Sequence, residues 1–113
     1  MKLVASFDYD SKTDSLYIYR KNENVKFSIN IQGDFIIDIN GKRKAVGLEV
    51  LNASKNLLPK SFLKEIKKAD IRTVIRDGFF GVKFRLMGVG PSVYNYNLSV
   101  PMKASAPKLL VRA

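Results

Sequence analysis

The chain has 113 residues, with 20 Lys and Arg residues against 10 Asp and Glu residues, and a formal net charge of +10. It contains no Cys, no His and no Trp. The lack of Cys excludes disulfides, thiolate catalysis and Cys-ligated metal clusters. The lack of His removes the side chain that most often performs acid–base catalysis and metal ligation near neutral pH. With 46% hydrophobic residues, a chain of this length is typical of one folded domain.

The N-terminal residues predict neither a secretory leader nor a membrane anchor. The chain reaches Asp8 before an apolar stretch of signal-peptide length can form. Its sequence also has no window that approaches the roughly 18 consecutive apolar residues that a membrane span needs. We therefore expect a cytoplasmic protein without a membrane partner.

The positive charge is concentrated in the second half of the chain. Residues 1–57 contain nine basic and seven acidic side chains, a balance of +2. Residues 58–113 contain eleven basic and three acidic side chains, a balance of +8. This asymmetry is a reason to ask separately what each half binds.

The first half predicts an antiparallel meander. Alternating apolar residues or clustered strand formers mark five strands. They cover residues 3–9, 16–19, 25–31, 35–39 and 45–51. Asn40-Gly41 lies between the last two and is a strong signal for a tight hairpin, because both residues tolerate positive φ. We therefore expect residues 1–57 to form a β-meander.

The second half predicts one helix and then three strands. Apolar residues at helical spacing from Phe62 to Ala69 follow a proline suited to a first helical turn, so we expect a helix over about 59–69 that ends at Asp70. Strand periodicity returns over residues 71–76, 82–87 and 93–100. The basic helix, hairpin and strand occupy residues 58–103, and residues 104–113 form a tail. The fold class expected for residues 1–113 is a single α+β domain, a mainly antiparallel sheet of about six to eight strands with one helix packed on it.

Two motifs follow one another in the first half. Tyr9-Asp10 precedes Asp14-Ser15-Leu16-Tyr17-Ile18, and later the run Val46-Gly47-Leu48-Glu49-Val50-Leu51-Asn52-Ala53-Ser54 follows a turn that begins after Asp38. In this order and spacing, over about residues 3–54, they resemble domain of unknown function family 2283. The resemblance implies a small β-meander followed by a helix, and it brings no catalytic residues because the family has no assigned activity. Some members lie beside genes for small toxins of the ribonuclease type, so the resemblance also implies an antitoxin-like protein partner. Residues from about 58 onward fall outside it.

The acidic cluster near the N-terminus resembles only the start of a calcium loop. Asp8, Asp10 and Asp14 provide carboxylates, but Lys12 replaces the ligand at the fifth position, and the loop's glycine and distal glutamate are missing. The alternative is that Asp10 and Asp14 bond amides in the turn between two strands. We favour the turn and predict no metal ligand and no cofactor.

The remaining carboxylates suggest no catalytic pair. Asp34 and Asp38 lie on the opposite parity from the apolar residues of their strand, so we expect both to point to solvent. Glu49, inside the family motif, is the most suggestive single acid, with either a structural or a partner-orienting role. Acid–base catalysis needs a second group with a shifted pKa nearby, and the sequence indicates none. We predict no catalytic residue and no enzymatic activity.

The clearest functional feature of the sequence is a set of basic residues on the predicted hairpin. If Asp77-Gly78 makes a two-residue turn, Arg72 lies opposite Lys83 and four cations share one face of the sheet. These candidate nucleic-acid-binding residues are Arg72, Arg76, Lys83 and Arg85, helped by Lys64, Lys67 and Lys68 of the predicted helix. Cations at strand spacing suit successive phosphates. Phe79 and Phe80, close to the turn, are candidates for contact with a partner.

Three functional hypotheses follow from these features. The first is a non-catalytic protein that binds DNA, RNA or another polyanion with the basic face. The second is a protein-interaction module, antitoxin-like or forming a homodimer, that uses edge strands or the tail. The third, an enzyme using carboxylates and lysine, is disfavoured by the missing His and Cys. A solvated charged face that deters aggregation is the alternative to any binding role.

Overall fold

The computed structural model describes residues 4–101, which form eight strands and two short helices. In chain order the elements are β1 (Val4–Asp10), β2 (Ser15–Tyr19), β3 (Phe27–Ile31), β4 (Phe35–Ile39), β5 (Ala45–Val50), α1 (Ala53–Asn56), α2 (Lys60–Leu63), β6 (Lys68–Arg76), β7 (Phe79–Met87) and β8 (Val93–Pro101). The predicted tail, residues 104–113, lies outside the described residues.

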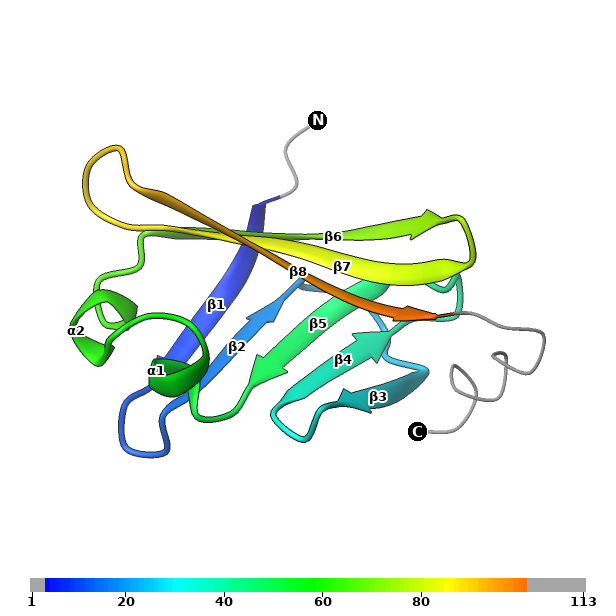
Figure 1. The fold of residues 1–113 in the computed structure, drawn as a ribbon, viewed down its shortest axis with the longest axis horizontal. Coiled ribbons are helices and arrows are strands. Elements are labelled where there is room, and N and C mark those ends of the chain that lie inside the picture. Colours follow the sequence, from blue (N-terminus) through cyan, green and yellow to red (C-terminus); the bar gives the residue numbers. More distant parts are fainter. Residues whose placement is uncertain (1–3, 102–113) are drawn as a thin grey trace.

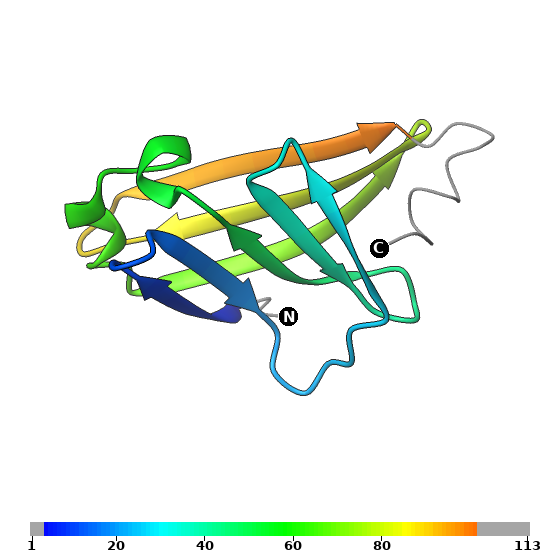
Figure 2. The same ribbon diagram turned by 90° about the horizontal axis from the view of Figure 1, so that it is seen from below.

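All eight strands belong to one antiparallel sheet with the order β3-β4-β5-β2-β1-β6-β7-β8. The junction between its two halves is narrow, because β1 pairs with β6 only through Val4 opposite Asp70 and Ala5 opposite Ala69. The three long strands β6, β7 and β8 run across the shorter strands of the first half (Figure 1). The sheet therefore curls over, with one half facing the other (Figure 2).

The core fills the space between the two halves of the curled sheet. Alternation along each strand sends one set of side chains inward, and residues from both halves form a single buried cluster. Its largest fully buried side chains are Phe80, Phe84, Leu16, Ile18, Ile37, Ile39, Leu48, Leu63, Ile71, Leu86, Val50 and Val82. The α+β class and the mainly antiparallel sheet are thus confirmed.

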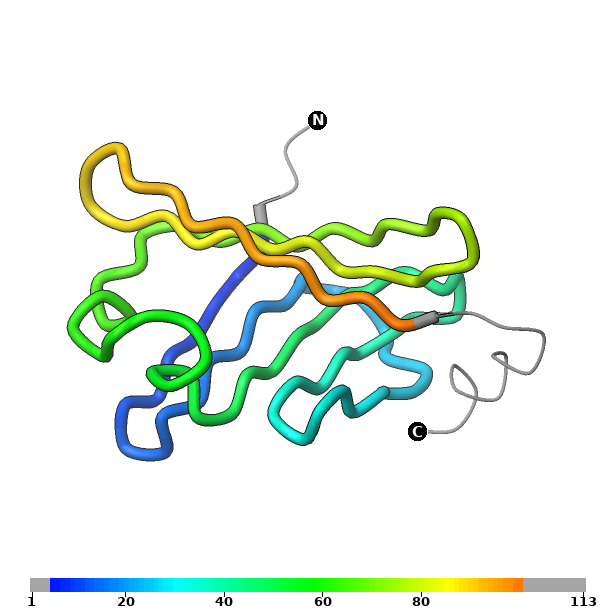
Figure 3. The backbone as a smooth tube through the Cα atoms, viewed as in Figure 1, coloured from blue at the N-terminus to red at the C-terminus, as the bar shows by residue number. Residues whose placement is uncertain are grey.

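The predicted helix over 59–69 is wrong in number and extent. Only α2 lies within the predicted range, α1 is a second short helix before it, and residues from Lys68 onward already belong to β6. The backbone N–H of Lys67 donates to the carbonyl of Met87 at 2.8 Å, which begins the pairing with β7. Asp70 therefore lies inside a strand and does not end a helix. Both helices gather at the same end of the molecule as the β7–β8 loop (Figure 3).

The turn between β6 and β7 forms as the sequence predicts. Asp77 and Gly78 have φ values of 49° and 80°, and Arg76 pairs with Phe79 directly across the turn. Two successive positive φ values are the geometry that lets a two-residue turn match the twist of its strands. The turn fixes the register of both long strands.

The hairpin expected at Asn40-Gly41 has a longer connection than predicted. Residues 40–44 link β4 to β5, and the positive φ falls on Arg43, at 64°, rather than on Asn40 or Gly41. The buried Asn40 side chain accepts hydrogen bonds from the backbone N–H groups of Lys42 and Lys44, both at 2.9 Å. The side chain of Asn40 thus organises the loop, which is an Asx-type role.

Candidate nucleic-acid interface

The face of β6–β8 that points away from the core holds most of the predicted cations. The register sets Arg72 opposite Lys83 and Asp70 opposite Arg85, with Asn97 and Asn95 continuing the two rows on β8. We call this surface the outer basic face. Its basic residues are Lys68, Arg72, Arg76, Lys83 and Arg85. All five are exposed, while their neighbours in sequence on β7 point into the core.

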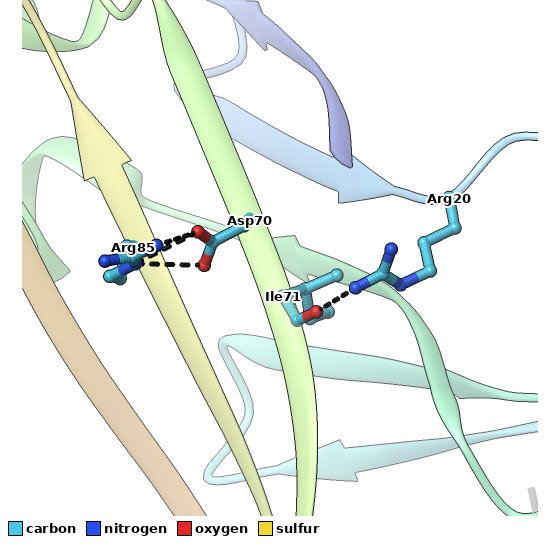
Figure 4. A network of polar contacts seen from close by, with 4 residues as sticks. All are labelled: Arg20, Asp70, Ile71 and Arg85. Carbon is cyan, nitrogen blue, oxygen red and sulfur yellow. Dashed lines mark hydrogen bonds and ion pairs between the residues drawn. The ribbon is translucent and has the colours of Figure 1, made fainter. Parts of the chain in front are cut away.

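One of these cations is neutralised by a carboxylate on the same face. Arg85 Nη2 lies 2.6 Å from Asp70 Oδ2, and Arg85 Nε donates to the same oxygen at 3.0 Å (Figure 4). The side chain of Asp70 is 10% exposed and that of Arg85 is 45% exposed. The hydrogen bonds and charge of Asp70 raise the pKa of the Arg85 guanidinium. The sequence analysis, which placed Asp70 at a helix end, missed this pair.

The other basic residues of this face have no such partner. Within residues 4–101, no ion pair reaches Arg72, Arg76 or Lys83. Like charges placed side by side on a sheet repel one another by a few tenths of a kcal/mol. Asp77, in the turn beside Arg76, is the nearest acid in the sequence. This part of the outer basic face is therefore an electropositive strip.

A hollow of about 520 Å³ opens in the middle of the strip. Gly81 lies in its floor, because a residue without a side chain on β7 leaves a gap between Val74 and Ser99. A Cβ added at Gly81 would lie 3.1 Å from the carbonyl oxygen of Leu98. The walls are formed by the outward-facing side chains around this gap, namely Val74, Arg76, Phe79, Lys83, Asn97 and Ser99, and by Asp77 of the turn.

The two phenylalanines beside the turn have opposite environments. Phe80 is 1% exposed and belongs to the core, so the expectation that it contacts a partner is wrong. The alternation of a strand sends one of two successive side chains inward, and the two-residue turn decides which one. Phe79 is 47% exposed and forms one wall of the hollow. An exposed aromatic ring therefore lines the same hollow as two cations, Arg76 and Lys83.

The three lysines assigned to the helix are dispersed. Lys68 begins β6 on the same face as Arg72. Lys67 precedes it and is exposed. Lys64 follows α2 and borders a different hollow, with Asp8 and Tyr9 of β1. Only Lys68 of the three extends the row of cations.

The acidic cluster near the N-terminus is structural. Asp10 accepts hydrogen bonds from the backbone N–H groups of Lys12 and Thr13 at 2.9 and 3.4 Å, as predicted for a turn. Asp14 instead accepts from Tyr9 Oη and Ser54 Oγ, each at 2.6 Å, and joins β1 to α1. Burial opposes ionisation of Asp14, but the bonds from Ser54 and Tyr9 outweigh it and lower its pKa. Burial and the bond to Asp14 raise the pKa of Tyr9 to about 12.

A second polar cluster lies on the outward face of β2–β5. Asp38 is half-buried rather than pointing freely to solvent, and it accepts hydrogen bonds from Tyr17 Oη at 2.8 Å and Ser28 Oγ at 2.7 Å. Burial, followed by the bond to Asp38, raises the pKa of Tyr17 to about 12. A Cβ at Gly47 would lie 2.7 Å from Asp38 Oδ2, so the glycine of the family motif makes room for this cluster. Glu49 lies opposite Tyr17 and faces away from the core.

The remaining chemistry of the described chain is limited. Over residues 4–101, no three Asp or Glu side chains gather closely enough to hold a metal ion. No helix in this range is long and apolar enough to cross a membrane. What the arrangement offers is a cationic surface with an aromatic ring beside it.

Comparisons with known proteins identify relatives of part of the chain. It is 33% identical over 76 residues to a protein of Methanosarcina mazei that carries the name of a hypoxanthine phosphoribosyltransferase, matching 66% of this chain and 61% of that protein. It is 38% identical over 53 residues to an uncharacterised protein of Methanocaldococcus jannaschii, matching 47% of this chain and 45% of that protein. The chain therefore spans less than two thirds of either relative. No solved structure matches it.

The family comparison agrees with the motifs at Tyr9–Ile18 and Val46–Ser54. The matched segment ends at α1, so the outer basic face lies beyond it. Residues 6–54, less than half of the chain, match the model of a family described as protein of unknown function (DUF2283).

Proposed function

We propose that the outer basic face binds single-stranded nucleic acid, DNA or RNA, in a non-catalytic role. The observation that carries this proposal is the hollow that the exposed ring of Phe79 lines together with Arg76 and Lys83. Cationic side chains at strand spacing contact phosphates, and a neighbouring aromatic ring stacks on a base. A single strand suits this site because its unpaired bases can turn toward the ring.

The charge balance of these strands supports the proposal over a merely solvated face. Residues 68–101 contain five basic and two acidic side chains. One of the acids, Asp70, is already bonded to Arg85. Asp77 is the other acid and borders the same hollow, so the strip formed by Arg72, Arg76 and Lys83 has fewer interspersed acids than an ordinary soluble surface, on which both signs alternate. A polyanion would relieve the repulsion among these cations.

The size and polarity of the hollow are consistent with this ligand. Its volume of about 520 Å³ is within the range of sites that bind small molecules or single residues of a polymer. Asn97 and Ser99 on β8 add hydrogen-bonding groups that can reach a base edge or a sugar. The remainder of the bound nucleic-acid strand would follow the cations of the outer basic face toward Lys68.

The test is a binding titration with short fluorescent oligonucleotides. A labelled oligo-uridine or oligo-thymidine of about 12 nucleotides is titrated at low salt and followed by fluorescence anisotropy. Arg76→Gln with Lys83→Gln should weaken binding about tenfold, because two phosphate contacts are lost. Lys12→Gln with Lys55→Gln makes the same change in net charge at distant exposed positions and should have a small effect. Equal weakening by both double variants would overturn the proposal, because total charge and not the face would then control binding.

A second candidate function is association with another protein or with a second copy of the chain. The observation that favours it is that β8 lies at one edge of the sheet, so one side of this nine-residue strand is available for pairing. An exposed apolar residue, Val93, begins this strand and is 45% exposed. An antitoxin-like partner would use this mode.

Light scattering after size exclusion separates the two candidates. A concentration-dependent dimer that persists at high salt and does not respond to Arg76→Gln with Lys83→Gln would favour strand pairing. A monomer at all concentrations, with salt-sensitive binding of the oligonucleotide, would favour the nucleic-acid role.

A further inference from the structure

A second basic cavity lies where the two halves of the sheet separate. Among residues 4–101, β1 pairs with β6 only at Ala69 and Asp70, and no described strand pairs with that edge of β6 from Ile71 onward. A cavity of about 580 Å³ opens at this point between β6, the β2–β3 connection and the β4–β5 loop. We call it the seam pocket. It is distinct from the hollow around Gly81 and shares no residue with it.

Two polar contacts bridge the seam and define the pocket. The guanidinium of Arg20, directly after β2, donates to the carbonyl oxygen of Ile71 (Figure 4). The backbone N–H of Ala45 donates to Thr73 Oγ1 at 2.7 Å. These contacts hold the β4–β5 loop and the β2–β3 connection against β6. The walls of the pocket are therefore fixed relative to one another.

The loop that carries two of the lysines is itself ordered. Asn40 Oδ1 accepts from the N–H groups of Lys42 and Lys44, and Asn40 Nδ2 donates to Glu23 Oε1 at 3.2 Å. The buried amide thus uses its acceptor and a donor within the loop and its neighbour. A loop held in this way presents its lysines at little further cost in conformational entropy.

The charge of the pocket is predominantly positive. Its lining includes four basic residues and one acid, namely Arg20, Lys42, Lys44, Arg72 and Glu23. Glu23 is bonded to Asn40, so its carboxylate is already partly satisfied. Asn22 and Asn24 add amide groups to the lining. The site is therefore rich in hydrogen-bond donors that converge from three segments of the chain.

We propose that the seam pocket binds a small anion that contains a pyrophosphate group, free or as part of a nucleoside diphosphate. Adjacent phosphates carry several charges and many acceptor oxygens, so they can accept from lysines on one wall and an arginine on the other. The volume of the pocket matches that of small-ligand sites. The proposal goes beyond the binding of nucleic acid on the outer basic face and uses different lysines.

The experiment is an NMR titration of the full chain labelled with ¹⁵N. Sodium pyrophosphate is added at low salt, with AMP, ADP and citrate in parallel. Pyrophosphate should cause saturable shifts of the amides of residues 41–45 and 71–73, while the amides around Gly81 move little. ADP should bind more tightly than AMP. ADP binding at least as tightly as pyrophosphate would support the nucleoside diphosphate, and weaker ADP binding would support the free anion.

Variants decide whether the pocket is responsible. Lys42→Gln with Lys44→Gln should weaken pyrophosphate binding about tenfold. Both side chains are exposed, and both backbone N–H bonds to Asn40 are retained, so the fold should survive. Lys12→Gln with Lys55→Gln should change affinity little. Shifts that do not saturate, equal losses in the two double variants, or citrate binding as tightly as pyrophosphate would each overturn the proposal.

Discussion

Arg85 donates two hydrogen bonds to Asp70 Oδ2, from Nη2 at 2.6 Å and from Nε at 3.0 Å. The two residues lie on the outward face of neighbouring strands. The pair removes one cation from the strip that the sequence suggested. Arg72, Arg76 and Lys83 remain without an ion-pair partner in the range 4–101. The distinction matters because a phosphate must compete with Asp70 for Arg85.

The first prediction concerns this pair. Asp70→Asn should release Arg85 and make the salt dependence of oligonucleotide binding steeper by about one contact. It should also destabilise the fold, because Asp70 is buried at 7% exposure and Arg85 loses its partner. Salt titrations of binding and urea unfolding measure the two effects. Arg85→Gln should leave the salt dependence of oligonucleotide binding nearly unchanged. If Arg85→Gln reduced the salt dependence as much as Arg76→Gln does, the distinction between the paired Arg85 and the other cations would be contradicted.

The second prediction concerns the aromatic wall of the hollow. Phe79→Ala should weaken binding of a single-stranded oligonucleotide about tenfold, because stacking on a base is worth about 1–3 kcal/mol. Phe79→Tyr should retain most of the affinity. Ile75→Ala serves as a control, because Ile75 is exposed at 55% but does not line the hollow. Fluorescence anisotropy provides the measurement, and equal effects of Phe79→Ala and Ile75→Ala would contradict a stacking role.

The third prediction concerns the glycine beside Asp38. Gly47→Ala should lower the free energy of unfolding by about 1–3 kcal/mol, because the new Cβ would lie 2.7 Å from Asp38 Oδ2. Displacing Asp38 should also lower the Tyr17 pKa from its value of about 12, since the bond to Asp38 helps to raise it. Urea unfolding and NMR titration of the tyrosine ring carbons measure these changes. Gly41→Ala is the control, because the nearest atom there is Lys26 Cδ at 4.0 Å.

The fourth prediction concerns the dependence of stability on pH. The pKa of Asp14 is lowered in the folded chain by bonds from Ser54 and Tyr9 that outweigh burial. Its contribution is therefore present above the unfolded-state pKa of about 3.9 and is lost as the pH falls through the lower folded-state value. Asp14→Asn should cost about 1–2 kcal/mol at pH 7, and this difference should shrink in acid. Asn tolerates the positive φ of 56° at this position.

Urea unfolding of both proteins between pH 7 and pH 2 measures the difference. Asp8→Asn, at an exposed position of β1, is the matched control and should show a smaller difference at pH 7. A loss of stability in Asp14→Asn that stays constant as the pH falls would contradict the assigned role of the carboxylate.

Much of the sheet could be predicted because strand alternation and turn chemistry are local properties. The two-residue turn at Asp77-Gly78 is enough to predict the register of β6 and β7, and the pairing of Arg72 with Lys83 follows from that register. The helix over 59–69 was wrong because Ile66 and Ala69 satisfy helical spacing, while pairing of Lys67 with Met87 draws the chain into the sheet. That pairing joins residues that are twenty positions apart in the sequence.

The candidate sites were less predictable than the strands. The placement of the four cations and the exposure of Phe79 follow from strand parity, and so does the burial of Phe80, which shares the parity of Val82 and Phe84. The Asp70–Arg85 pair was hidden by the wrong helix. The seam pocket brings together residues near 20, 42 and 72, and no local pattern connects them.

The salt dependence of oligonucleotide affinity tests the central claim most directly. For wild-type protein and a short oligo-uridine, three phosphate contacts predict a slope of log K against log salt of about −2. In Arg76→Gln with Lys83→Gln the slope should become shallower, at about −0.7, because one phosphate contact remains. Lys12→Gln with Lys55→Gln should keep the wild-type slope. Equal slopes in all three proteins, or no binding at low salt, would contradict the assignment of the outer basic face to nucleic acid.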